Sequence, residues 1–215
     1  MRGVYEALYR LRVRPWDRAD IPGPLARAAE ARPNGRDRPG GSDRSDGRDR
    51  PDRRDRSDRR DGDRPARAVD LGCGTGTQAR YLAQRGWAVT AVDFVSTAVA
   101  AARRDDPDQS VTWRVADVTD VSTVDPDGRL AGAVHLLLDN GCLHGLGVSQ
   151  RPGWVHTVDV LAAPSALLLV RAVPRRRGPG PRGIDSADLD ALLRPRWQAE
   201  DHPEPDWYAY RRGPA

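Results

Sequence analysis

Apolar and polar residues follow one another along this chain in a way that predicts alternating strands and helices. Short apolar runs predict strands, and their continuous hydrophobicity is typical of parallel strands covered on both faces. The expected strands are residues 68–71, 87–92, 111–115, 130–138 and 166–173. Helical spacing predicts helices at residues 4–11, 24–30, 78–83, 97–104, 152–163 and 187–193. Residues 197–200 and 207–211 predict a closing hairpin, so the pattern as a whole indicates an α/β fold.

Residues 33–65 interrupt this pattern. They are almost wholly Arg, Asp, Gly, Ser and Pro and contain no apolar side chain that could offset the entropy cost of ordering. We therefore predict a disordered insert at 33–65, between a helical segment at 1–32 and an α/β domain at 66–215. An arginine-rich RNA-binding segment is the alternative. It is disfavoured because the arginines alternate with aspartates, which cancels the field that a polyanion needs.

Composition narrows the class of protein. The chain has 215 residues, enough for one α/β domain, and its 35 basic and 31 acidic residues are too evenly mixed to indicate a nucleic-acid partner. No apolar run reaches the roughly 18 residues of a membrane span, and no signal-peptide core is visible, so we expect a cytoplasmic protein without a membrane partner. Cys73 and Cys142 are the only cysteines, which argues against a disulfide framework. No group has metal-ligand spacing, so no metal is expected.

The stretch VDLGCGTGT, residues 69–77, joins the first predicted strand to a helix through three glycines. Gly72, Gly74 and Gly76 suit a turn that needs positive φ and lets a ligand approach closely. The helix that follows offers unpaired N–H groups to a ligand. The second strand ends at Asp93, about twenty residues on, where a carboxylate can hold the hydroxyls of a ribose. The pattern therefore predicts a nucleotide-type cofactor.

The spacing of these glycines separates two kinds of cofactor. In the dinucleotide fingerprint G-x-G-x-x-G the third glycine comes one residue later than Gly76, and an acid such as Asp70 before the first glycine is unusual. The run D-L-G-C-G-T-G instead resembles the first motif of class I S-adenosylmethionine (SAM)-dependent methyltransferases. The resemblance implies SAM as the cofactor and a Rossmann-like seven-stranded sheet. That sheet is mostly parallel with an antiparallel last strand, and helices cover both of its faces.

Four aspartates fall at or near the ends of predicted strands, where ligands bind in open α/β sheets. The resemblance implies a role for each. Asp70 would order the glycine loop around the methionine part of SAM, and Asp93 would accept the ribose hydroxyls. Asp117 would bind the adenine amino group, with the Val118 N–H on a ring nitrogen, and Asp139 would face the sulfonium end. Taken singly, each aspartate could also be a helix cap or a turn residue.

The segment after the fourth predicted strand resembles a loop found in one subgroup of these methyltransferases. Residues 139–144, DNGCLH, resemble the D-x-G-C-[LF]-H loop of small-molecule methyltransferases related to the thiopurine, thiol/halide and tellurite-resistance groups. A Pro-Trp-Asp segment, here residues 15–17, occurs in the same relatives and lies over the cofactor there. This implies that residues 1–32 form an N-terminal lid and that Trp16 contacts the cofactor; a packing anchor is the alternative for Trp16.

Few side chains in the expected site can move a proton. His144 and Asp139 are the candidate bases, and a loop histidine that holds backbone is the alternative for His144. Cys142 lacks the preceding proline of cytosine-C5 methyltransferases, and no Asn-Pro-Pro-Tyr motif is present. We therefore expect a SAM-dependent methyltransferase acting on a small molecule, with a thiol or other soft nucleophile as acceptor. The alternatives are a macromolecule or natural-product scaffold as acceptor, or a non-catalytic SAM-binding protein.

Overall fold

The computed structural model describes residues 6–7, 11, 20–31, 65–174, 182–200 and 204–214. Most of the expected helix at 4–11, the Pro-Trp-Asp segment at 15–17 and residues 33–64 of the expected insert lie outside the described residues. The division of the chain into lid, insert and domain therefore stays a prediction.

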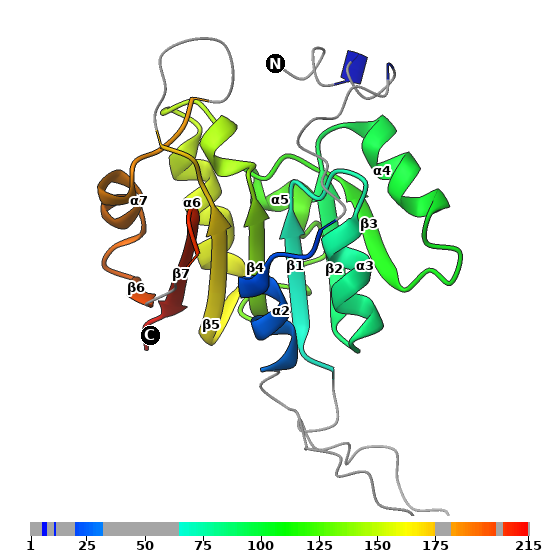
Figure 1. Ribbon diagram of the computed structural model, residues 1–215, viewed down its shortest axis with the longest axis horizontal. Helices are drawn as coiled ribbons and strands as arrows, with labels where there is room; N and C mark the ends of the chain where they lie inside the picture. The colour runs from blue at the N-terminus through cyan, green and yellow to red at the C-terminus, as the bar shows by residue number, and fades with distance from the viewer. Residues whose placement is uncertain are drawn as a thin grey trace, which may run out of the picture.

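In the described residues, seven strands form one sheet in the order β3-β2-β1-β4-β5-β7-β6 (Figure 1). The strands β1 to β5 pair in parallel along this order, and β7 runs antiparallel to both β5 and β6. This arrangement confirms the predicted fold class. The strands are β1 (Arg67–Leu71), β2 (Ala88–Asp93), β3 (Val111–Val115), β4 (Val134–Asn140), β5 (Ala162–Arg171), β6 (Trp197–Glu200) and β7 (Trp207–Arg212).

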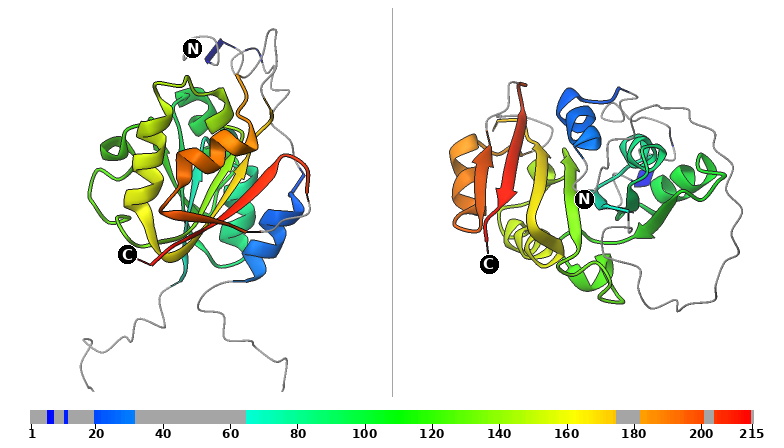
Figure 2. Two further views of the ribbon diagram at one scale, coloured as in Figure 1. Left: turned by 90° about the vertical axis from the view of Figure 1, so that its left-hand side faces the viewer. Right: turned by 90° about the horizontal axis from the view of Figure 1, so that it is seen from below.

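Helices cover both faces of the sheet because each face presents apolar side chains that must be buried. One core contains side chains of α2, α3 and α4, and the other contains side chains of α5, α6 and α7. Figure 2 shows α2 and α6 on opposite sides of the sheet. The helices are α2 (Gly23–Glu30), α3 (Thr77–Gln84), α4 (Ser96–Arg104), α5 (Val121–Val124), α6 (Arg151–Leu161) and α7 (Ser186–Leu193), with a 3₁₀ turn, η2, at Leu143–Gly145.

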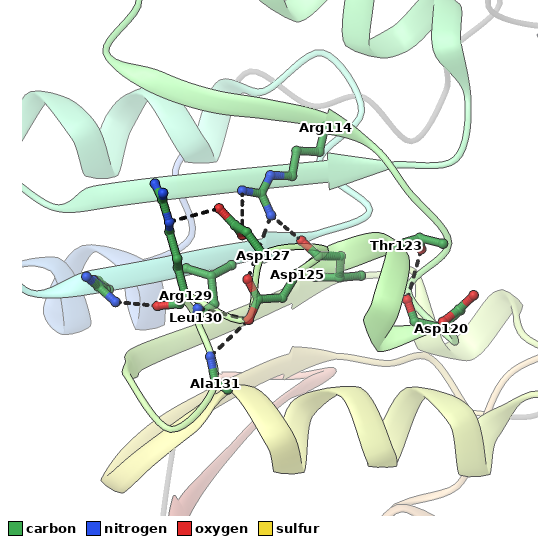
Figure 3. A network of polar contacts seen from close by, with 10 residues as sticks. Arg114, Asp120, Thr123, Asp125, Asp127, Arg129, Leu130 and Ala131 are labelled. Atoms are coloured by element: carbon green, nitrogen blue, oxygen red, sulfur yellow. Dashed lines mark hydrogen bonds and ion pairs between the residues drawn. The ribbon is translucent and has the colours of Figure 1, made fainter.

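Two strands begin four residues away from the predicted position. The strand expected at residue 130 begins at Val134, because the Asp125 carboxylate accepts the N–H groups of Leu130 (2.9 Å) and Ala131 (3.0 Å) and holds this segment in a turn (Figure 3). The strand expected at residue 166 begins at Ala162, and its pairing with β4 is irregular at the start. A proline and a positive φ of 58° at Ser165 lie in that irregular part.

The helix α2 is the part of the N-terminal segment that the structure places on the domain. Leu25, Ala28 and Ala29 are buried in the same core as Trp87, and the Trp87 Nε1–H donates to the carbonyl of Ala29 at 3.2 Å. This contact fixes the position of α2 on the domain.

The parallel strands end at the upper edge of the sheet in Figure 1. The loops that follow β1, β2 and β4 lie at this edge.

Candidate functional site

The ends of β1, β2 and β4 meet at this edge because β1 pairs with β2 on one side and with β4 on the other. The chain leaves β1 at Leu71 and turns at once. The N–H groups of Gly72 and Cys73 both donate to the carbonyl of Val92, at 2.8 and 2.9 Å. These two bonds hold the glycine loop against the end of β2.

The glycine loop has the conformation that its sequence predicts. Gly72, Gly74 and Gly76 have φ values of 80°, 55° and 81°, in the left-handed region that favours glycine. A Cβ on Gly72 would lie 2.7 Å from the Cβ of Cys142, and one on Gly76 would overlap the Trp113 ring. Two of the glycines are therefore required by neighbouring side chains as well as by the turn.

Asp93 joins the end of β2 to this loop. Its side chain is buried, and its Oδ2 accepts the N–H of Gly74 at 3.0 Å while Oδ1 accepts the N–H of Val95 at 2.8 Å. The carboxylate thus fixes both the glycine loop and the entry to α4. The helix α4 begins at Ser96, one residue earlier than the sequence predicted, and Val95 is its N-cap residue.

Asp70 is the most unusual group in the site. It is 1% exposed, and its Oδ2 is buried without a hydrogen-bond partner in the described part of the chain. Burial, and then the nearby charges of Asp139 and Asp93, raise the pKa of Asp70 from 3.8 to about 8. A buried carboxylate oxygen without a partner is costly unless a cation or donor is supplied. The site therefore has an unmet need for positive charge.

Asp139 differs from Asp70 because both of its carboxylate oxygens accept hydrogen bonds. It is 0% exposed, and its oxygens accept the N–H groups of Gly141 (3.1 Å), Cys142 (2.7 Å) and Leu143 (3.0 Å) and the indole N–H of Trp154 (2.9 Å). Burial nevertheless raises the pKa of Asp139 to about 6. These bonds use both carboxylate oxygens, so Asp139 holds the loop after β4 in place. Its roles as a candidate base and as a group that faces the sulfonium end stay predictions.

His144 lies in η2, at the end of the loop that Asp139 holds. A Cβ on Gly141 would lie 3.1 Å from the His144 Cε1, so the imidazole packs directly on this glycine. Its Nδ1 is buried without a partner in the described residues, and burial lowers the pKa of His144 below 6.5. The imidazole is therefore neutral at pH 7. It can accept a proton from a group that reaches Nδ1.

Both cysteines of this region are protonated thiols at neutral pH. Burial, followed by the charges of nearby aspartates, raises the pKa values of Cys73 and Cys142 well above 9.0. The thiolate is the reactive form of cysteine, so these values disfavour Cys142 as a nucleophile, in agreement with the sequence.

Asp117 follows β3 on the same edge and is exposed. Its Oδ1 accepts the N–H and the hydroxyl of Thr119 at 2.9 and 2.7 Å. The Ala116 N–H donates to the Asp93 carbonyl at 3.1 Å, which keeps this turn beside the end of β2. Val118, the other expected adenine contact, is 6% exposed.

A polar network stabilises the connection from β3 to β4 (Figure 3). The Arg114 guanidinium donates to the Val124 carbonyl at 2.7 Å and forms ion pairs with Asp125 at 3.9 Å and Asp127 at 3.5 Å. Arg114 is the residue of β3 that pairs in register with Val92. The network therefore anchors residues 124–127 of this connection to Arg114 of β3.

The structure brings Asp70, Asp93, Asp117 and Asp139 to one edge of the sheet, as their positions at strand ends predicted, while Trp16 lies outside the described residues. Sequence reasoning missed two tryptophans that shape this edge. Trp113 fills the space beside Gly76, and Trp154 donates to Asp139. The one available signal was that a buried indole N–H needs an acceptor.

The described residues contain neither a metal-binding cluster nor a membrane-spanning helix. No group of three or more His, Cys, Asp or Glu side chains among them is placed to hold a metal ion. Within the same ranges, no helix is both long enough and apolar enough to cross a membrane.

Part of this chain is similar to known proteins. Residues 68–158 match the family model described as "Methyltransferase domain". A 2-heptyl-1-hydroxyquinolin-4(1H)-one methyltransferase from Mycobacteroides abscessus is 28% identical over 138 residues, which are 62% of this chain and 59% of the relative. The chain thus spans about three fifths of the length of this relative.

Solved structures share the fold. One, described as "Conversion of a Disulfide Bond into a Thioacetal Group during Echinomycin Biosynthesis", has a TM-score of 0.69 at 18% identity and covers 99% of this chain and 93% of its own. Another is a Burkholderia thailandensis 1,6-didemethyltoxoflavin-N1-methyltransferase with bound S-adenosylhomocysteine (SAH); its TM-score is 0.54 at 23% identity, over 70% of this chain and 72% of its own. Residues 68–158 are therefore similar to a methyltransferase domain, and the glycine loop and the sheet order agree with the class I, SAM-dependent type.

Proposed function

We propose that the protein binds SAM at the glycine loop and transfers its methyl group to a small-molecule acceptor. The observation that carries this proposal is the partnerless, buried Oδ2 of Asp70 within a cluster of aspartates. The charges of Asp139 and Asp93 add to burial in raising the pKa of Asp70 to about 8. Such a cluster fits a ligand that brings positive charge.

The residues present fit SAM better than a dinucleotide. SAM carries a sulfonium and an ammonium group, and either can satisfy the carboxylate of Asp70. The pyrophosphate of a dinucleotide would instead lie beside the buried carboxyl groups of Asp70, Asp93 and Asp139, which offer it no positive charge. Asp70 would hold the ammonium group, directly or through water. Asp93, beside Gly74, would accept the ribose hydroxyls, and Asp117 and Val118 would meet the adenine ring.

Methyl transfer from SAM requires few catalytic groups from the protein. When bound, SAM supplies a methyl carbon on a sulfonium sulfur: the acceptor's lone pair bonds to this carbon while the C–S bond breaks and its electron pair stays on the sulfur of SAH. The chain contributes alignment and exclusion of water. Asp139 fixes the loop that carries His144, through three backbone N–H groups. The neutral His144 imidazole would take the acceptor's proton where the acceptor needs a base.

The finer proposal is that the acceptor is a soft nucleophile, a thiol or a related species. A thiol with a pKa near 8.5 is already a few per cent ionised at neutral pH and needs only a dry, aligned pocket. The described residues hold neither a metal group that could activate a hydroxyl nor an Asn-Pro-Pro-Tyr cradle for an amine.

A hydroxylated heteroaromatic acceptor is the second candidate. It is favoured by the Mycobacteroides relative, which is a hydroxyquinolinone methyltransferase. It is also favoured by the Nδ1 of His144, which has no partner in the described residues and can serve as a base for a hydroxyl.

The test has two stages. Calorimetry should detect SAM and SAH binding by the purified protein, with NAD as the negative control. SAH release is then followed with panels of thiols, phenols and heteroaromatic hydroxyl compounds. Tight NAD binding, or an absence of SAM binding by folded protein, would contradict the proposal. SAM binding without SAH release across the panels would favour a non-catalytic SAM-binding protein.

A further inference from the structure

A row of three side chains crosses the sheet where β4 and β5 end. The strand register pairs Asn140 with Arg171 and Arg171 with Trp207. Directly paired residues project on the same face of a sheet, and neighbours in sequence project on opposite faces. The row therefore lies on one face, and the Asp139 carboxylate, which meets Trp154 of α6, lies on the other.

The face that carries the row is the one covered by α2. Leu138 and Leu169, two residues before Asn140 and Arg171, belong to the core that contains Leu25 of α2. Beyond this core, at the carboxyl edge, the row lines a pocket together with residues that precede α2 and β7, namely Asp20, Pro22, Glu204 and Pro205. Asn140 directly precedes Gly141, so the pocket adjoins the loop that we place at the methyl-transfer centre.

The two polar side chains of the row have unmet hydrogen-bonding capacity. The Asn140 Oδ1 is buried and has no partner in the described ranges. The half-buried Arg171 side chain forms no ion pair and donates no hydrogen bond among the residues that the structure describes. A carbonyl oxygen requires an N–H or O–H donor, and a guanidinium matches a carboxylate or similar oxyanion through two parallel bonds.

The other charges of the pocket limit what can enter. Glu204 faces α2 and forms an ion pair with Arg27 at 3.4 Å, and Asp20 is exposed. Arg171 is therefore the cation of this lining that no described acid already pairs with. Two acids on the lining disfavour a second negative charge on the ligand, so the pocket suits a ligand with one anionic group and a neighbouring donor.

We propose that this pocket receives the methyl acceptor, and that the acceptor is an organic monoanion. Arg171 binds its carboxylate or comparable oxyanion, Asn140 accepts from an adjacent N–H or O–H, and Trp207 contributes an apolar wall. The inference rests on the proposed function and adds to it the charge class of the substrate. It holds for a thiol acid and for a hydroxy acid alike.

The experiment measures binding to the SAH-saturated protein, so that it does not depend on turnover. The probes are matched pairs, 3-mercaptopropionate with 1-propanethiol and salicylate with phenol, each titrated by calorimetry at neutral pH, where both thiols are protonated. We expect each acid to bind at least tenfold more tightly than its neutral counterpart. Arg171→Gln should abolish this preference and leave SAH affinity unchanged, Arg171→Lys should retain part of it, and Arg104→Gln, on exposed α4 surface, should retain all of it.

Asn140→Leu provides a second variant of similar volume. It should weaken salicylate binding at least fivefold while the affinity for SAH and the melting temperature stay close to those of the parent. The inference would be overturned if acids and their neutral counterparts bound with equal affinity. It would also be overturned if Arg171→Gln weakened the binding of both to the same extent. Neither result would contradict the proposed function. Loss of SAH binding by the parent protein would instead overturn the proposed function.

Discussion

Replacing Asp70 by asparagine should make the protein more stable and its cofactor binding weaker. The substitution keeps the size of the side chain and removes the charge that burial, Asp139 and Asp93 disfavour. It also removes the anion that we propose as the partner of the SAM ammonium group. These two effects have opposite signs, as expected where a destabilising group is retained for function.

The magnitude follows from the pKa of Asp70, which rises from 3.8 to about 8 on folding. Because the folded state holds the proton more tightly than the unfolded state, the contribution of Asp70 to stability is fully present below pH 3.8. It is lost as pH rises through 8. At about 1.4 kcal/mol per pKa unit, the loss is about 4 kcal/mol at pH 7 and about 6 kcal/mol above pH 8. In a domain of this size, each kcal/mol recovered raises Tm by about 2–4 °C.

Melting curves of the parent and of Asp70→Asn between pH 5 and 9 measure this directly, with Asp105→Asn on the exposed surface after α4 as the matched control. The parent should lose stability as pH rises through this range, and Asp70→Asn should lose much less. Calorimetry should show SAM affinity falling about 10- to 100-fold in the variant. In the parent, SAM affinity should rise with pH toward 8 as binding releases the Asp70 proton. Identical pH profiles for the two proteins, or undiminished SAM binding by the variant, would refute the reasoning.

Four further outcomes are expected. Asp93→Ala should lower SAM affinity on the order of a hundredfold, since it loses the ribose contact and the bond to the Gly74 N–H; unchanged affinity in a folded variant would contradict this role. His144→Ala should slow methylation of a thiol by less than about a hundredfold but that of a hydroxyl by about 10² to 10⁴, so equal losses on both would exclude a base role. Gly72→Ala should destabilise the protein on the order of 1–3 kcal/mol, because its φ is 80° and its Cβ would lie 2.7 Å from that of Cys142; an unchanged denaturation midpoint would count against this geometry. Deleting residues 36–64, which contain no apolar side chain, should move Tm by only about a degree or two, and a drop above about ten degrees would show that they pack on the domain.

The sequence alone predicted the architecture because the physics of each element is local. Continuous apolar runs indicated parallel strands, and the three glycines before a helix indicated a turn with positive φ, which Gly72, Gly74 and Gly76 adopt. The hairpin after the last helix predicted an antiparallel strand, and β7 runs antiparallel to both of its neighbours. The run D-L-G-C-G-T-G, led by Asp70, departs from the dinucleotide fingerprint and resembles the first motif of SAM-dependent methyltransferases.

Where strands begin was less predictable, because hydrophobicity does not record competition for backbone hydrogen bonds. The apolar run from residue 130 contains both a turn and β4. The turn exists because the Asp125 carboxylate captures the N–H groups of Leu130 and Ala131, and the Arg114 guanidinium holds Asp125 in turn. The hydrophobic periodicity of the sequence does not indicate that these residues contact one another.

Only the tertiary structure shows that the aspartates differ in their hydrogen-bond partners. In the sequence, Asp70, Asp93 and Asp139 are alike, each near the end of an apolar run. In the fold, Asp139 accepts hydrogen bonds from its own loop and from Trp154, and Asp93 accepts one from the glycine loop. The Asp70 Oδ2 has no partner among the residues that the structure describes. Likewise, Asn140 and Arg171 share a row only because β4 and β5 pair in one particular register. Local pattern determines which elements form, whereas the partners of a buried charge depend on packing between segments far apart in the chain.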